Sequence, residues 1–194
     1  MLKPGINDLF PTPVMLGKIG DDIRQQVADE ILSDEVLINT RAADDNDILF
    51  AVGNEIVDRF RDTVAIPALD DYMQKSLGLG LRDFSGYKVK AWVTNFNNFQ
   101  SLNLHNHRGS YLSSVFYLIA ENKDQGGEIS FVDPRSNANR GYNTRFGQWF
   151  DNVDFMPSTG DYIVFPSFLY HYVQLYAGVN RLTVVVDLFL YDED

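Results

Sequence analysis

The chain contains three histidines, and their spacing suits the binding of one metal ion. His105 and His107 flank a single asparagine, and His171 lies far downstream. A neutral imidazole offers one ring nitrogen with a lone pair and is the commonest metal ligand in proteins. Side chains at positions i and i+2 lie on the same face of an extended strand. We therefore predict a two-ligand clamp at His105 and His107, with His171 as the third ligand.

A second chemical feature is Arg181, which follows His171 by ten residues and opens the apolar run Arg-Leu-Thr-Val-Val-Val. A guanidinium group is planar, keeps its charge and matches a carboxylate at two points. An arginine in a strand built for burial needs an anion. The anion would be either a bound dicarboxylate or an internal acid such as Asp187.

Composition sets the limits for these sites. The chain has 194 residues, of which 45% are hydrophobic and 13% aromatic, so a single domain with a substantial core is expected. Sixteen basic and 27 acidic residues give a net charge of −11, which argues against broad nucleic-acid binding. The absence of cysteine excludes disulfides, thiolate zinc sites and a cysteine nucleophile. With no signal-like or membrane-spanning stretch, we expect a soluble, cytoplasmic protein without membrane contact.

The first 85 residues are expected to form an edge strand and supporting helices. Residues 14–19 suit a strand, and apolar residues at helical spacing predict a helix over about 22–33. Residues 40–46 are polar and acidic, as in a surface loop. The helical pattern returns over 48–77, with a break expected at Pro67. The edge strand also suggests pairing between chains in a homodimer.

Residues 86–194 change to a period of two, which is typical of strands. Strands are predicted at 87–95, 112–119, 128–132, 161–165, 170–176 and 181–191, and 95–103 is predicted as a loop. The segment 133–160 is rich in arginine and aromatic residues and is interpreted as an ordered lid. The order of elements favours an α+β, mainly β fold: an antiparallel barrel or sandwich with helices packed on one face.

The second half also carries an ordered series of motifs. These are His105-x-His107, Gly126-Gly127-x-Ile129-x-Phe131, Gly160-Asp161, His171 and Arg181-x-Thr183. The series resembles the double-stranded β-helix, a cupin-like jelly roll, of the 2-oxoglutarate- and iron(II)-dependent dioxygenases, over about residues 92–190. The Leu-Phe-Pro-Thr-Pro-Val opening at residues 9–14 is similar to a branch of this superfamily associated with phages and bacteria. The resemblance implies one domain, 1–194, whose core at 86–194 carries the metal site.

The resemblance also assigns roles to residues. It implies that His105 and His171 bind Fe(II) and that Arg181 binds the distal carboxylate of 2-oxoglutarate. The superfamily usually has H-x-D or H-x-E at the first pair, whereas this chain has His107 at the acidic position. A third imidazole keeps three facial ligands but removes one negative charge. Either His107 is the third ligand, or a carboxylate such as Asp133 approaches the metal instead.

Three further residues are expected around the co-substrate. Thr183 would add a hydroxyl from the same strand face as Arg181. Tyr117 and Asn95 are expected to line the site, although strand packing explains them nearly as well. The implied reaction is hydroxylation of an unknown substrate with O₂ as oxidant, and the implied catalytic set is His105, His107 and His171.

Two alternatives stay open. Cupins share the barrel and bind metal through H-x-H and a distal histidine, and Gly160, Pro166 and His171 resemble part of their second motif. Phe168 stands where that motif has glycine, and no glutamate follows H-x-H at the cupin spacing. A cupin-like dioxygenase or isomerase would not need 2-oxoglutarate and would leave Arg181 unexplained. The other alternative is a non-catalytic, phage-associated binding barrel.

Overall fold

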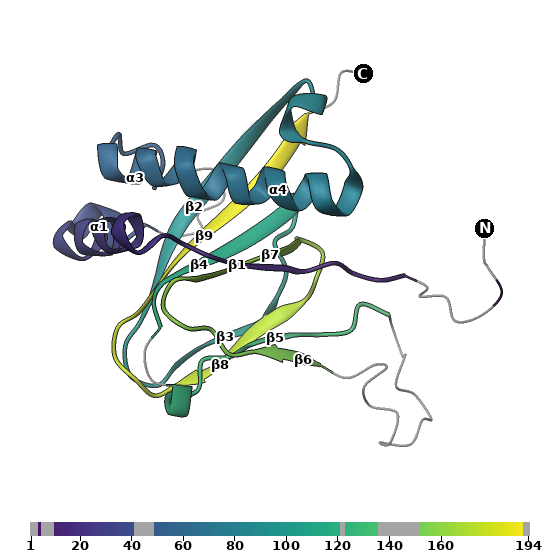
Figure 1. Cartoon of the computed structure of the whole chain (residues 1–194). Helices are drawn as coiled ribbons and strands as arrows, with labels where there is room; N and C mark the ends of the chain where they lie inside the picture. The colour runs from purple at the N-terminus through teal and green to yellow at the C-terminus, as the bar shows by residue number, and fades with distance from the viewer. Residues whose placement is uncertain (1–3, 5–9, 41–48, 121–122, 136–151, 192–194) are drawn as a thin grey trace, which may run out of the picture.

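The computed structural model describes residues 4, 10–40, 49–120, 123–135 and 152–191. Two antiparallel sheets face each other, and helices cover the outer face of the larger sheet (Figure 1). This is the mainly β, jelly-roll architecture with helices on one face that the sequence predicts. None of the described helices is long and apolar enough to cross a membrane.

The N-terminal part supplies one edge strand and the helical layer. Its elements are β1 (Met15–Lys18), α1 (Asp21–Ser33), α2 (Glu35–Ile38), α3 (Glu55–Phe60) and α4 (Ile66–Leu77). Helix α1 buries Val27 and Ile31, as its spacing predicts. The break expected at Pro67 takes another form: Pro67 lies in the first turn of α4, where proline is tolerated. The irregularity is the π-helical turn Arg61–Ala65 just before it.

The larger sheet has the order β1-β7-β4-β9-β2. Its other strands are β2 (Gly86–Phe96), β4 (Leu112–Ile119), β7 (Asp161–Pro166) and β9 (Arg181–Tyr191). Side chains alternate across β9. Leu182, Val184, Val186 and Leu188 pack in the core beneath the helices. The other four residues of this stretch, from Arg181 to Asp187, therefore point toward the second sheet.

The smaller sheet has the order β3-β8-β5-β6. Its strands are β3 (Gln100–His105), β8 (His171–Tyr176), β5 (Ile129–Phe131) and β6 (Val153–Phe155). The prediction of a loop over 95–103 is wrong for β3. This strand is exposed along nearly its whole length and has irregular register with β8, so it lacks the apolar alternation that marks a strand. Residues 136–151, most of the expected lid, lie outside the described residues.

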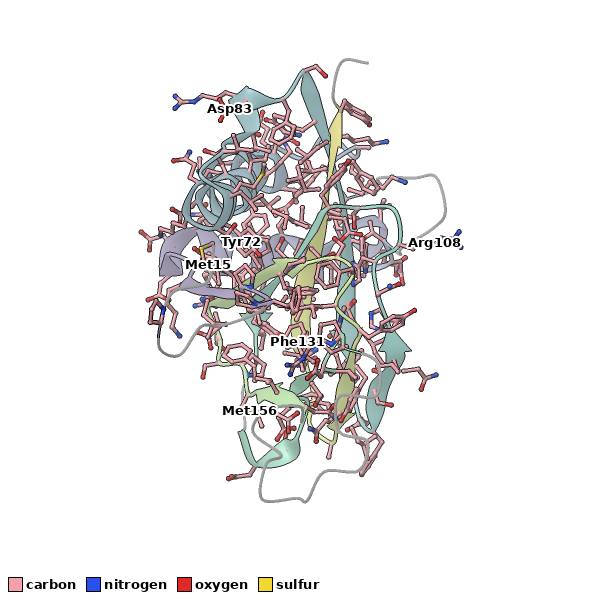
Figure 2. All side chains as sticks on the ribbon, turned by 90° about the vertical axis from the view of Figure 1, so that its right-hand side faces the viewer. Met15, Tyr72, Asp83, Arg108, Phe131 and Met156 are labelled. Carbon is pink, nitrogen blue, oxygen red and sulfur yellow. The ribbon has the colours of Figure 1, made fainter. Side chains whose placement is uncertain are left out.

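The apolar core has two layers. The first lies between the helices and the larger sheet, where Phe60 meets Phe116 edge to face with ring centroids 5.2 Å apart. The second lies between the two sheets, where Phe131 and Phe165 meet at 5.0 Å. Figure 2 shows Tyr72 in the helical layer and Phe131 in the layer between the sheets. Of the predicted site residues, the three histidines, Arg181, Thr183 and Tyr117 lie in or beside this second layer.

Candidate metal centre

The three histidines come together at one end of the space between the sheets. His105 ends β3 and His171 begins β8, and the two are paired directly across the sheet with ring centroids 4.4 Å apart. His107 lies beyond the strand, in the loop after β3, where its N–H donates to the carbonyl of Ser167. The predicted clamp on a single strand is therefore corrected: one ligand candidate ends a strand and the other lies in a loop.

The three histidines are close enough for a ring nitrogen of each to bind the same metal ion. One ligand nitrogen from each ring can be chosen so that all three lie within 4.8 Å of one another. Each Nδ1 lies at hydrogen-bond distance from an oxygen that can only accept: Asn103 O at 2.7 Å from His105, Leu169 O at 3.0 Å from His171, and Asp187 Oδ1 at 2.7 Å from His107. The proton therefore belongs on Nδ1 in each ring, and the lone pair on Nε2.

Burial keeps two of these rings in the neutral form. Desolvation lowers the pKa of His171 to about 3, and it also holds the pKa of His105 below its ordinary value. Phe131 and Phe165 pack against His171 with ring centroids 5.7 and 5.0 Å away. A neutral imidazole with a free Nε2 is the form that binds a metal ion.

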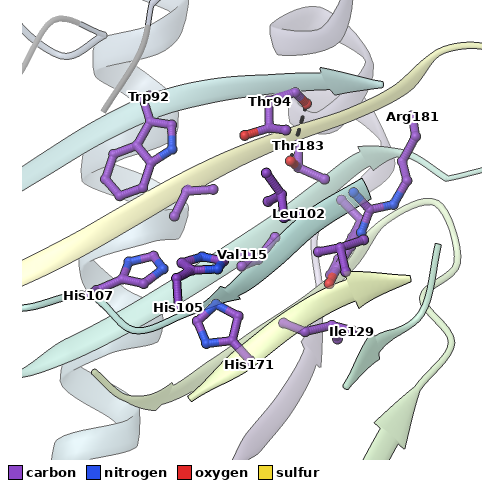
Figure 3. A pocket seen from close by; sticks show the side chains of 13 residues that line it. Trp92, Thr94, Leu102, His105, His107, Val115, Ile129, His171, Arg181 and Thr183 are labelled. Carbon is purple, nitrogen blue, oxygen red and sulfur yellow. Dashed lines mark hydrogen bonds between the residues drawn. The ribbon is translucent and has the colours of Figure 1, made fainter. Parts of the chain in front are cut away.

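The histidines open into a pocket between the sheets. Figure 3 shows their rings gathered at one end, and Arg181 reaching into the pocket at the other. The remaining lining residues come from both sheets: Trp92, Thr94, Leu102, Val115, Tyr117, Ile129, Val173, Thr183 and Val185. The pocket therefore joins the two features that the sequence singles out, the histidine group and the arginine.

Arg181 is held in this pocket as a buried cation without a carboxylate partner among the described residues. Only 3% of its surface is exposed, and its Nε has no hydrogen-bond partner. The guanidinium lies over the rings of Phe96 and Tyr117, with 5.2 and 5.1 Å from its carbon to the centroids. Burial lowers its pKa. Asp187, the internal acid considered as its partner, bonds to His107 instead.

Side chains alternate between the two faces of β2, β4 and β9, and this alternation places further polar groups beside Arg181. Thr183 faces Tyr117 on one side and Thr94 on the other, and its hydroxyl donates to Thr94 O at 3.2 Å. The Tyr117 hydroxyl is buried without a partner, and burial raises its pKa to about 12, so it keeps its proton. Asn95 is not brought to the pocket, because it points to the other face of β2 from Thr94.

Sequence reasoning missed three features of the site. Trp92 lines the pocket with its ring 5.5 Å from that of His107. Thr94 shares its face of β2, and the alternation that placed both was visible in the sequence. Asp187 contacts His107 across 80 residues of sequence, which no local pattern signals. Asp133, considered as a replacement ligand, pairs with Arg135 instead.

Comparison with solved structures defines the fold. A prolyl-4-hydroxylase from Pseudomonas putida is 17% identical and has a TM-score of 0.64, covering 94% of this chain and 89% of its own. HygX from Streptomyces hygroscopicus, solved with nickel and 2-oxoglutarate bound, is 13% identical with a TM-score of 0.60 and coverages of 91% and 82%. The viral collagen prolyl hydroxylase of Paramecium Bursaria Chlorella virus-1 is 8% identical, with a TM-score of 0.58 and 99% coverage of both chains. The shared fold is the double-stranded β-helix of oxygenases.

A family match gives the narrower identification. The model of a family described as "Putative 2OG-Fe(II) oxygenase" matches residues 90–187, which is half of the chain. The chain belongs to this family. It is an oxidoreductase of the class that uses iron(II) and 2-oxoglutarate, as its motif series predicts. No curated protein matches the sequence.

Proposed function

We propose that this chain is a hydroxylase in which His105, His107 and His171 bind iron(II) through their Nε2 atoms. The supporting observation is the coincidence of two features in one pocket: three imidazoles with their Nδ1 protons engaged elsewhere, and a buried arginine that meets no anion in the part of the chain that the structure describes. Three facial ligands leave three coordination positions for exogenous ligands. Bound iron(II) supplies the redox chemistry that couples 2-oxoglutarate and O₂ to oxidation of a C–H bond.

The chain's own residues would position the co-substrate. Arg181 pairs with the distal carboxylate, and this ion pair offsets the cost of burying the guanidinium. The Tyr117 hydroxyl, buried and unpartnered, donates a second hydrogen bond to the same carboxylate. Thr183 would join them only by turning its hydroxyl proton from Thr94 O to the carboxylate, which accepts hydrogen bonds and cannot donate them. The apolar walls formed by Val115, Ile129 and other residues exclude water from the pocket.

Exposed apolar side chains in the segments that carry the histidines are candidates for contact with the substrate. Leu104 and Tyr170 are direct sequence neighbours of His105 and His171, and both are exposed. Phe168 and Tyr111 are also exposed, and both flank the Ser167 contact of the His107 loop.

The homodimer suggested by the sequence would pair through the outer edge of β1, which bounds the larger sheet. The cytoplasmic location expected from the sequence stays a prediction.

The test is metal stoichiometry together with 2-oxoglutarate turnover. We expect one iron(II) bound per chain under anaerobic conditions, with loss of binding in His105→Ala. We also expect consumption of 2-oxoglutarate with O₂, measured as succinate formation. Unchanged metal binding in His105→Ala would refute the metal site. Stoichiometric metal without affinity for 2-oxoglutarate would instead support the cupin-like alternative.

A further inference from the structure

Asp187 is a buried carboxylate placed directly behind one of the proposed metal ligands. It is 7% exposed and lies on β9 between Val186 and Leu188. Its Oδ1 lies 2.7 Å from His107 Nδ1 and also accepts from Ser113 Oγ at 2.7 Å. Within the described part of the chain, its one ion-pairing contact is with His107.

A chain of serine hydroxyls extends from this carboxylate. Ser113 Oγ lies 2.9 Å from Ser167 Oγ, and Ser110 donates to Ser167 at 2.8 Å. Each hydroxyl has one proton and the carboxylate only accepts, so Ser113 donates to Asp187 and Ser167 donates to Ser113. The single proton of Ser110 is shared between Ser167 Oγ and the backbone carbonyl of His107, which lies 2.9 Å from Ser110 Oγ. The backbone of Ser167 also accepts from the N–H of His107. Side chain and backbone of the His107 loop are thus tied to one network.

Charge shows why this network matters. The usual facial set contains two histidines and one carboxylate, and here His107 takes the position of the carboxylate. No lysine or arginine of the described residues forms an ion pair with Asp187, although a buried anion is costly without a cation. A divalent ion on the other side of the His107 ring would meet that need.

We propose that Asp187 is the anionic member of this metal centre, acting through His107 from outside the coordination sphere. The inference rests on the proposed function, in which His107 binds the metal. As a positioning residue, Asp187 holds the ring so that Nε2 faces the metal. Its charge also makes the imidazole a stronger donor, as in other carboxylate–histidine–metal arrangements. The negative charge absent from the ligand set lies one hydrogen bond behind it.

The first experiment compares Asp187→Asn with Asp161→Asn in the full-length chain. Asp161 is a matched control: it lies on β7 of the same sheet, accepts from Ser158 N at 2.7 Å and pairs with Lys18, away from the histidines. We expect Asp187→Asn to weaken cobalt(II) affinity about 10- to 100-fold in anaerobic titrations. Asp161→Asn should leave that affinity unchanged. Equal affinities in Asp187→Asn and the parent chain, or equal losses in both variants, would overturn the inference.

A second readout separates charge from simple support of the fold. With iron bound, Asp187→Asn should raise the midpoint potential of the iron, because removal of an anion disfavours the more positive oxidation state. His107→Asp reverses the sign of the affinity effect. In that background two carboxylates face each other, so adding Asp187→Asn should strengthen cobalt(II) binding. A loss of similar size in both backgrounds would show a merely structural role.

The outcomes also separate this inference from the proposed function. If His105→Ala retains full cobalt(II) affinity, the metal site itself is refuted. If His105→Ala loses the metal while Asp187→Asn does not, the inference alone fails. Should Asp187→Asn not fold, Ser113→Ala removes a donor to the same carboxylate oxygen. We then expect several-fold weaker cobalt(II) binding, and unchanged binding would overturn the proposal.

Discussion

Replacing Arg181 with methionine should separate stability from co-substrate binding. In the chain without ligands, the guanidinium is buried and its Nε is unpartnered, so removing the charge relieves a desolvation cost. Exchanging buried charges for apolar groups is often neutral or stabilising by about 1–4 kcal/mol. The loss of two ring contacts, each about 0.5–2 kcal/mol, works against this gain. These two effects largely cancel, and we expect the free energy of unfolding to change by no more than about 3 kcal/mol in either direction.

Binding of 2-oxoglutarate should respond far more strongly to Arg181→Met. Truncating one partner of a buried charge pair costs about 2–5 kcal/mol. At about 1.4 kcal/mol per tenfold, the Kd should rise roughly 30- to 4,000-fold. Anaerobic calorimetry on the metal-loaded protein measures this Kd, and urea unfolding of the metal-free protein measures stability.

Arg24→Met is the matched control for this experiment. Arg24 is also a largely buried arginine, but it donates to Leu118 O at 3.1 Å and lies 3.6 Å from Asp21, on the helical side of the sheet. Its replacement leaves a carbonyl unpaired, which should cost about 1–3 kcal/mol of stability. The Kd for 2-oxoglutarate should not change. The reasoning is refuted if Arg181→Met binds 2-oxoglutarate within threefold of the parent chain, or if Arg24→Met weakens binding equally.

Three further predictions concern pH, the pocket and the fold. The pKa of His171 is about 3 in the folded chain and 6.5 in the unfolded chain, so the unfolded chain binds more protons between these values. The metal-free protein should therefore lose stability as the pH falls below 6.5, by about 2 kcal/mol at pH 5. Urea unfolding at pH 7 and 5 checks this, and His171→Gln should show a smaller pH effect. Tyr117→Phe removes a buried, unpartnered hydroxyl, so thermal stability should hold or rise while the Kd for 2-oxoglutarate, followed by calorimetry, rises up to about tenfold; a lower Kd would contradict its donor role. Gly17→Ala should lower the free energy of unfolding by about 1–3 kcal/mol, since its Cβ would overlap the Tyr162 ring on the neighbouring strand; unchanged thermal melting would contradict this packing.

The strands that sequence alone predicted are those with one apolar face or continuous burial. β4 and β9 read clearly because nearly every residue is buried. β3 escaped because its side chains are exposed and only backbone pairing with β8 makes it a strand. The periodicity of apolar residues predicts a strand only where at least one face of the strand is buried, and an exposed strand such as β3 lacks this pattern.

The sequence predicted those site residues whose chemical type is distinctive. It did not predict those whose place in the site depends on which face of a strand they occupy or on a contact between distant parts of the chain. The three histidines and Arg181 share one pocket, as their order and spacing suggest. The alternation along β2 is visible, but near the site both of its faces carry apolar side chains, Val93 on one and Trp92 on the other. The pattern therefore did not tell whether Thr94 or Asn95 turns toward the pocket. The bond between His107 and Asp187 joins a loop to a strand 80 residues away, and only the folded sheet brings them together.

Strand β9 carries Arg181 at one end of the pocket and, six residues further on the same face, Asp187 behind His107 at the other end. At about 3.3 Å per residue, this fixes roughly 20 Å between the two positions. The strand is paired on both sides, with β2 and β4, so it cannot stretch or slide. A single-residue insertion or deletion between them would turn one charged side chain toward the helices while leaving the other in place. The length of this segment is therefore more tightly constrained than the identity of the residues between the two charges, and we expect it to accept substitutions more readily than insertions or deletions.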